Sequence, residues 1–207
     1  MNTPIVHVID DDAGVRQATA RLLSAARFTV QTHQNGADFL AAAGRGSAGC
    51  IILDVRMPGG TGLDLQAAIA ERDDPLPIIF LTGFGTIPDS VRAMQGGAVD
   101  FLVKPVEPAI LLEAVSRALA RDAEDRRARA HRRAIRERYE RLTTREREVF
   151  LHLIAGQLNK QVAADLSISE RTIKLHRARI FEKLEVDSMA EVARLAFDLG
   201  IEPEQLT

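Results

Sequence analysis

The sequence predicts an α/β domain with a doubly wound five-stranded parallel sheet, then a long connector helix and a small all-α domain. Three observations support this fold class. Short apolar runs alternate with amphipathic stretches five times over residues 1–120, no glycine or later proline interrupts residues 109–140, and residues 142–200 show helical periodicity. At 207 residues the chain is long enough for two domains.

The composition is that of an ordinary globular protein, with 46% hydrophobic and 27% charged residues. No apolar run approaches the length of a membrane span, and the N-terminus lacks a signal-peptide pattern. The single cysteine, Cys50, rules out an internal disulfide and indicates a reducing compartment. We therefore expect a cytoplasmic protein with no membrane partner.

The expected strands are short apolar runs, each closed by polar or turn-forming residues. They are residues 5–9, 28–32, 50–53, 77–81 and 101–103. Apolar residues at helical spacing predict helices near 15–23, 37–43, 62–70 and 87–95, with a fifth that starts near Pro108, because proline suits the first turn of a helix.

Polar side chains follow four of these strands directly. Asp10 and Asp11 follow the first, Asp54 the third, Thr82 the fourth and Lys104 the fifth. A lone aspartate at a strand end usually just caps a turn. Parallel sheets, however, bind ligands at the carboxyl ends of their strands, so four such strand ends together predict a functional site.

The strand ends lie in four motifs, which are Val8–Asp12, Leu53–Pro58, Leu81–Gly83 and Asp100–Pro105. On these motifs, residues 1–120 resemble, over their full length, the flavodoxin-like receiver domain of two-component response regulators. It implies that Asp54 is the phosphoacceptor, since a carboxylate can attack phosphorus and form an aspartyl phosphate.

The resemblance also implies a Mg²⁺ cofactor, which prefers oxygen ligands. Asp11, Asp54 and the backbone carbonyl of Arg56 would bind the ion, with Asp10 helping through water. Asp12 is expected to cap the first helix instead.

Three further residues receive roles from the resemblance. Lys104 would neutralise the phosphoryl group, Thr82 would bond to it, and Phe101 would turn inward as part of the switch, although an aromatic residue on a strand also fits a plain core position. Arg56 and Phe84 flank the site, and we expect them to tune the lifetime of the phosphoryl group. Val106 departs from the family, in which an aromatic residue often follows the Lys-Pro pair.

Residues 121–141 are expected to form a charged helical linker, with 9 arginines against 5 acidic residues. A solvated helix is the preferred interpretation over contact with DNA phosphates. Apolar heptads are missing from residues 121–134, which argues against a coiled coil there.

The second domain, residues 142–207, is predicted to contain four short helices. Thr143 with Glu146 and Ser188 with Glu191 have the spacing of capping boxes, and Ser169 is an expected N-cap. The middle two helices are joined by a short turn, as in a helix-turn-helix unit. By topology alone, however, a small helical bundle that contacts other proteins is an equally good interpretation.

Three motifs stand out in this domain: Leu142–Val149, Asn159–Ala163 and Ser169–His176. With them, residues 142–200 resemble the LuxR-type helix-turn-helix DNA-binding domain, and the whole chain thus resembles a NarL/FixJ-type response regulator. Residues 170–184 would be the recognition helix in the major groove, and the last helix would pair two copies on two half-sites. The expected DNA-binding residues are Lys160, Arg171, Thr172, Lys174, Leu175, Arg177, Ala178, Arg179 and Lys183.

The function implied by both resemblances is that of a phosphorylation-controlled transcription regulator. A sensor histidine kinase would phosphorylate Asp54, which would promote homodimerisation and sequence-specific binding to promoter DNA. No enzyme activity is implied beyond Mg²⁺-dependent self-phosphorylation and dephosphorylation. The alternatives are a regulator that ignores phosphorylation and an aspartyl-phosphate phosphatase, in which a second carboxylate would be needed where Arg56 stands.

Overall fold

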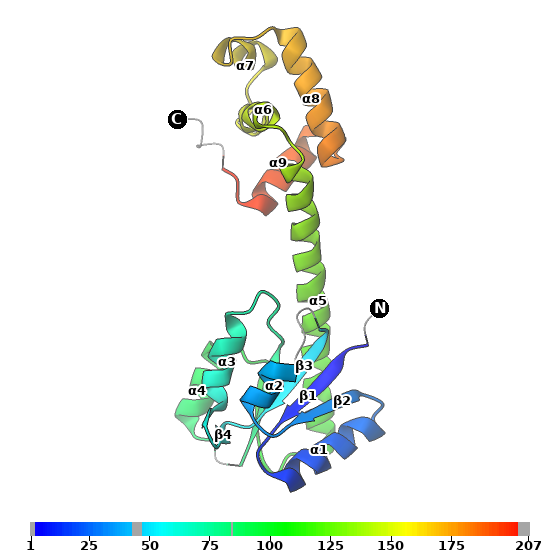
Figure 1. Ribbon diagram of the computed structural model, residues 1–207, viewed down its shortest axis with the longest axis vertical. Helices are drawn as coiled ribbons and strands as arrows, with labels where there is room; N and C mark the ends of the chain where they lie inside the picture. The colour runs from blue at the N-terminus through cyan, green and yellow to red at the C-terminus, as the bar shows by residue number, and fades with distance from the viewer. Residues whose placement is uncertain (1–2, 43–46, 84, 203–207) are drawn as a thin grey trace. The chain divides into compact units, whose positions relative to one another are not determined.

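The structure is a computed structural model that describes residues 3–42, 47–83 and 85–202 (Figure 1). The chain divides into two compact units, a first unit of residues 1–126 and a second unit of residues 127–207. Within the described ranges, no helix is both long and apolar enough to cross a membrane.

The first unit is built on a five-stranded sheet, in which every pair of neighbouring strands is parallel and the order is β2-β1-β3-β6-β7. The predicted fold class is therefore confirmed. Strands β3 and β6 are buried along their whole length, which explains why their sequences are continuously apolar and do not alternate with polar residues. The strands are β1 Ile5–Ile9, β2 Thr29–His33, β3 Gly49–Leu53, β6 Ile78–Thr82 and β7 Asp100–Val103.

Helices cover both faces of this sheet, as expected for a doubly wound fold. Alternate residues of β3 point to opposite sides, so that Ile51 and Leu53 belong to one buried cluster, while Cys50 and Ile52 belong to another. The first cluster receives side chains from α2 Gly36–Ala42, α3 Gly62–Ala70 and α4 Ile87–Gln95; the second receives them from α1 Ala13–Ala25 and α5 Pro108–Glu140.

A short antiparallel hairpin follows Asp54 and was not among the predicted elements. It pairs β4 Arg56–Met57 with β5 Gly60–Thr61. The next residue, Gly62, starts α3 so close to the backbone of Asp54 that a Cβ atom would lie 2.2 Å from the Asp54 carbonyl oxygen. The hairpin and this glycine fix the chain immediately after Asp54.

Helix α5 is 33 residues long, which confirms the long helix predicted from the absence of breakers. Its first turns are buried against the sheet through Leu111, Ala114, Val115 and Ala118. Further along, the buried carboxylate of Asp122 accepts a hydrogen bond from the backbone N–H of Gly49 at 3.0 Å. This bond ties α5 to the first residue of β3.

Cys50, the next residue of β3, is fully buried. Burial, with a further contribution from the negative charge of Asp122, raises the pKa of its thiol to about 12. The thiol is therefore protonated at neutral pH and sealed from solvent.

Two histidines are buried together beside α2. The Nδ1 atom of His7 lies 3.1 Å from the Nε2 atom of His33, and both rings pack edge-on against Phe39. Burial, and then the neighbouring His33, lower the pKa of His7 to about 4. Both rings are thus neutral members of the core at pH 7.

The second unit is a cluster of helices around one core. These are α6 Thr144–Ile154, α7 Asn159–Asp165, α8 Glu170–Leu184 and α9 Met189–Leu199, with the last turns of α5 packed against them through Ile135 and Tyr139. The four predicted helices are all present in the second unit, together with these turns of α5.

The helix caps largely follow the sequence pattern. Thr143 and Glu146 form the predicted capping box, and Ser169 accepts from the backbone N–H of Thr172. At α9, Ser188 caps the helix, but the carboxylate of Glu191 accepts from the backbone N–H of Asp187, one residue before the predicted partner. The second predicted capping box is therefore wrong in one of its two contacts, because Glu191 bonds to Asp187 instead of Ser188.

The buried histidine pair makes the stability of the first unit depend on pH. Because the pKa of His7 is lower in the folded state than in the unfolded state, the unfolded state binds more protons between pH 6.5 and about 4, and acid favours unfolding. We expect a loss of about 2 kcal/mol from pH 7 to pH 5 through His7 alone.

This loss is measured by urea unfolding of the wild type and of His7→Leu at both pH values. Circular dichroism follows the whole chain, and the fluorescence of Tyr139, the one tyrosine of a chain without tryptophan, identifies the transition of the second unit. The same pH dependence in both proteins would show that His7 does not titrate on unfolding.

Candidate functional site

The carboxyl edge of the sheet brings together polar residues that lie far apart in the sequence. Strands β1 and β3 are neighbours in which Ile9 pairs with Leu53, so the next residues, Asp10 and Asp54, stand side by side. The backbone N–H of Asp54 donates to the carbonyl of Ile9 at 3.0 Å, which extends the pairing up to the site.

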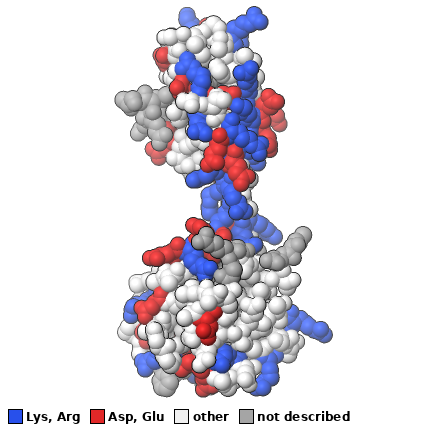
Figure 2. All heavy atoms as spheres, viewed as in Figure 1, with Lys and Arg blue, Asp and Glu red and all other residues white. Residues whose placement is uncertain are grey.

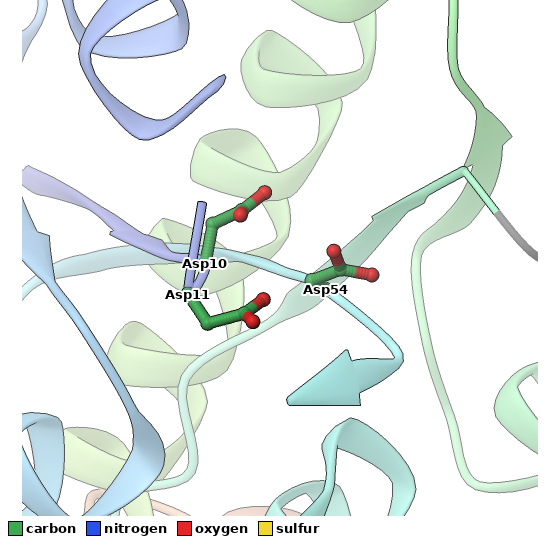
Figure 3. A group of neighbouring side chains, drawn as sticks. All are labelled: Asp10, Asp11 and Asp54. Carbon is green, nitrogen blue, oxygen red and sulfur yellow. The ribbon is translucent and has the colours of Figure 1, made fainter. Parts of the chain in front are cut away.

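Three carboxylates converge at this edge (Figure 3). Asp10, Asp11 and Asp54 each offer an oxygen atom, and these oxygens lie within 4.8 Å of one another. Asp10 is buried, Asp54 is half-buried and Asp11 is exposed. Three negative charges at this separation repel one another, so the site requires a compensating cation.

Lys104 supplies part of this compensation from the end of β7. Its Nζ atom donates to Oδ2 of Asp10 at 2.7 Å and to Oδ2 of Asp54 at 3.1 Å. Its backbone N–H donates to the carbonyl of Thr82 at 2.8 Å, which holds the end of β7 against β6.

The pKa shifts at the site follow from burial and from this contact. Burial raises the pKa of Asp10, and the hydrogen bond and charge of Lys104 offset only part of that rise. Burial alone would lower the pKa of Lys104, but the two carboxylates outweigh it and raise the pKa above its ordinary value. Lys104 is thus a fixed cation at neutral pH.

The donor set fits a small hard cation. All three side chains offer oxygen atoms, one of them exposed to solvent, and Mg²⁺ prefers carboxylate oxygens while keeping several waters. The backbone of Arg56 also lies at the site, because its N–H approaches Oδ1 of Asp54 at 3.4 Å.

Asp12 has a separate role. Its side chain accepts from the backbone N–H groups of Gly14 and Val15, which caps α1 and lowers the pKa of Asp12. This agrees with the role expected from the sequence.

Thr82 and Phe101 lie on the neighbouring strands β6 and β7. Thr82 is fully buried, whereas Phe101 is half-buried, with its ring centroid 5.9 Å from that of Phe80. Val106 packs against the buried cluster beneath α1 and α5. Phe84, the other residue expected to flank the site, lies outside the described residues.

The second unit carries the residues expected to contact DNA. Helix α8 exposes one face that contains Lys174, Leu175 and Ala178, while Arg171, Arg179 and the α7 residue Lys160 are also exposed. Thr172 is half-buried, with its hydroxyl 2.8 Å from that of Ser169. Figure 2 shows basic side chains crowding α5 and mixing with acidic ones on the second unit.

Two members of the expected DNA-binding set have partners within the protein. Arg177 donates to Oδ1 of Asn159 at 2.7 Å, which joins α8 to α7. Lys183 donates to Oε2 of Glu146 at 2.6 Å, which joins α8 to α6. These contacts make both side chains part of the packing of α8.

Glu146 is itself buried and also accepts from the backbone N–H of Thr143 at 2.8 Å. Burial alone would raise its pKa, but the hydrogen bonds from Lys183 and Thr143 outweigh it and hold the pKa below its ordinary value. The capping-box spacing predicted the bond to Thr143, whereas no sequence signal pointed to Lys183.

We expect Glu146→Gln to lower the free energy of unfolding of the second unit by about 1–2 kcal/mol, since Lys183 loses its anionic partner while the amide oxygen still accepts from Thr143. The measurement is urea unfolding followed by Tyr139 fluorescence. The matched control is Glu148→Gln on the same helix. Its pair with Arg145 is more accessible to solvent, with side chains 44% and 36% exposed, and is worth less than about 0.5 kcal/mol. Equal effects of the two changes would contradict the role of the buried pair.

Comparisons with known proteins agree with this geometry. Residues 6–116 match the family model of the response regulator receiver domain, and residues 140–196 match that of the bacterial regulatory proteins of the luxR family. The chain is 41% identical over 198 residues to the transcriptional regulatory protein FixJ of Azorhizobium caulinodans, covering 96% of this chain and 94% of that protein.

Two further relatives cover almost the whole chain. Nodulation protein W of Bradyrhizobium diazoefficiens is 39% identical over 197 residues, covering 95% of this chain and 87% of that protein. The solved structure of the response regulator StyR is similar with a TM-score of 0.83 and 41% identity, covering 94% of this chain and 98% of that one. The chain therefore belongs to the two-component response regulators that join a receiver domain to a LuxR-type DNA-binding domain.

Proposed function

We propose that this protein accepts a phosphoryl group on Asp54 from a sensor histidine kinase and then regulates transcription as a DNA-bound homodimer. The observation that supports this most directly is the cluster of Asp10, Asp11 and Asp54, two of which, Asp10 and Asp54, bond to Lys104. In this proposal residues 1–120 are the receiver, residues 121–141 a charged linker and residues 142–207 the DNA-binding domain. A regulator of this kind acts where the DNA is, in the cytoplasm.

Asp54 is the proposed nucleophile. Its carboxylate oxygen attacks the phosphorus of a phosphohistidine, the bond from phosphorus to the histidine nitrogen breaks, and the nitrogen is left to take up a proton. Asp11, Asp54 and the Arg56 carbonyl would hold Mg²⁺, with Asp10 helping through water. The ion supplies positive charge to the phosphoryl oxygens, and Lys104 supplies a further fixed positive charge.

The switch would use residues already placed at the sheet edge. The hydroxyl of Thr82 gains a partner once the phosphoryl group exists, which favours the state in which Thr82 moves toward Asp54 and Phe101 turns inward. The half-buried position of Phe101 leaves part of its ring to be buried by such a turn. Arg56 and Phe84 would tune how long the phosphoryl group lasts.

An exposed apolar surface supports pairing of two receivers. Ile87, Val91 and Met94 recur on one face of α4 and are 81%, 48% and 48% exposed, and Val103 on the adjoining β7 is 54% exposed. A second copy would bury this surface. Phe197 on α9, which is 84% exposed, would serve the pairing of two DNA-binding domains on two half-sites.

In the DNA complex, α8 would lie in the major groove. Lys174, Leu175 and Ala178 face outward and would contact base edges, the two apolar side chains meeting thymine methyl groups. The phosphate contacts would come from Lys160, Arg171, Thr172 and Arg179. Since Arg177 and Lys183 already have protein partners, we propose that they support DNA binding through the position of α8.

The two alternatives differ in measurable ways. A regulator that ignores phosphorylation would pair equally with and without a phosphoryl group on Asp54. A phosphatase would need a general acid near Asp54, and Arg56 stands two residues after it. Sustained turnover of phosphate esters would favour the phosphatase.

The central test is sedimentation velocity of the full chain with Mg²⁺, with and without beryllofluoride, which mimics a phosphoryl group on a carboxylate. We expect beryllofluoride to convert monomer to dimer in the wild type and to have no effect on Asp54→Asn.

Asp73→Asn, in an exposed loop of the same unit, is the matched control and should respond as the wild type does. Val91→Glu should remain monomeric in beryllofluoride because a charge replaces part of the apolar surface. If Asp54→Asn dimerised in beryllofluoride to the same extent as the wild type, phosphorylation-driven pairing would be contradicted.

Lys104 tests the electrostatics of the site. We expect Lys104→Met to bind Mg²⁺ about tenfold more tightly at low salt, because a competing positive charge leaves the carboxylates, while the response to beryllofluoride is lost. Isothermal titration calorimetry measures the affinity, with Lys160→Met in the other unit as the control. Weaker Mg²⁺ binding by Lys104→Met would mean that Lys104 organises the carboxylates instead of competing with the ion.

A further inference from the structure

An arginine lies on the buried face of the last turns of α5. Ile135, Arg138 and Tyr139 lie on one face of α5, and Leu142 follows just beyond its end. The three apolar residues among them pack in the core of the second unit. Arg138 is largely buried for an arginine, with 27% of its side chain exposed. An arginine can bury its apolar stem against a core while its guanidinium reaches polar partners at the edge.

The guanidinium meets the end of α8. Its Nη1 atom donates to the carbonyl oxygen of Leu184, the last residue of α8, at 3.2 Å. Its Nε atom also lies 3.6 Å from the carboxylate of Glu185, the residue that ends the helix in a left-handed conformation. The last carbonyls of a helix lack partners within the helix and carry partial negative charge, so a cation there is favourable.

Two other polar contacts of α8 are made by its own side chains. Arg177 bonds to Asn159 of α7, and Lys183 bonds to Glu146 of α6. The bond from Arg138 is made instead to the backbone of the last residue of α8, so it holds that end of the helix directly and not through an α8 side chain.

We propose that Arg138 is a positioning residue for base recognition. It connects the last turns of α5 to the backbone of the recognition helix and holds α8 in the position in which its exposed face meets the major groove. The proposal rests on the proposed function in one respect, that α8 is the helix that contacts base edges. Contacts to bases require an accurately placed helix, whereas phosphate contacts by flexible basic side chains tolerate a shift.

The test uses the full chain with Mg²⁺ and beryllofluoride. The first probe is the duplex that the wild type enriches most strongly from a pool of random duplexes, and the second is a scrambled duplex of the same composition. If the wild type enriches no sequence, the proposed function fails, and this outcome is distinct from a failure of Arg138 as a positioning residue.

For Arg138→Ala we expect about tenfold weaker binding to the enriched duplex and a change of less than about twofold for the scrambled duplex. Arg138→Lys should recover most of the affinity, because an ammonium can also donate to the Leu184 carbonyl. Arg141→Ala is the matched control. Arg141 lies 3.5 Å from the Glu185 carboxylate and is 60% exposed, so we expect the wild-type affinities.

Equal losses on both duplexes, unchanged binding to the enriched duplex, no recovery in Arg138→Lys, or the same loss in Arg141→Ala would each overturn the proposal. Arg138→Gln provides the comparison if Arg138→Ala does not fold. If Arg138→Gln loses affinity for the enriched duplex alone, the role of Arg138 is supported. If Arg138→Gln binds with wild-type affinity, or if it does not fold, the proposal is overturned.

Discussion

The contact of Lys104 with Asp10 and Asp54 is the interaction on which the rest of the receiver depends. It holds two carboxylates together at a sheet edge where one of them is buried, and this arrangement would be unstable without a cation. The contact also joins the ends of β1, β3 and β7 across the intervening strand β6. The same geometry therefore stabilises the fold and places a fixed positive charge 3.1 Å from the carboxylate of Asp54, the proposed phosphoacceptor.

Much of the fold and of the site could be predicted because the relevant signals are local. Uninterrupted apolar runs such as residues 50–53 identify buried parallel strands, and the polar residue after each run then falls at one edge of the sheet. The helix caps at Asp12, Thr143 and Ser169 could also be predicted from the sequence, since each side chain needs only a backbone N–H a few residues away as its partner. Local signals and fold agree in these segments.

The contacts that could not be predicted join residues distant in sequence through long or buried side chains. Nothing near Asp122 indicates that its carboxylate meets Gly49, and nothing near Lys183 or Arg138 indicates Glu146 or the Leu184 carbonyl. An arginine or a lysine on a helix is usually solvated, so its sequence position says little about its partner. These contacts decide how α5 and α8 are held, which the periodicity of the sequence leaves open.

Because Cys50 is fully buried in β3, the reactivity of its thiol reports local opening of the receiver sheet. A thiolate is the species that reacts with disulfide reagents and oxidants, and in the closed sheet this thiol is neither ionised nor exposed. Its reaction with an aromatic disulfide would therefore require β3 to separate from its neighbours, and the rate would report how often this opening occurs. Since β3 leads directly to Asp54, this rate would compare how firmly the site is closed in its phosphorylated and unphosphorylated forms, without any added label.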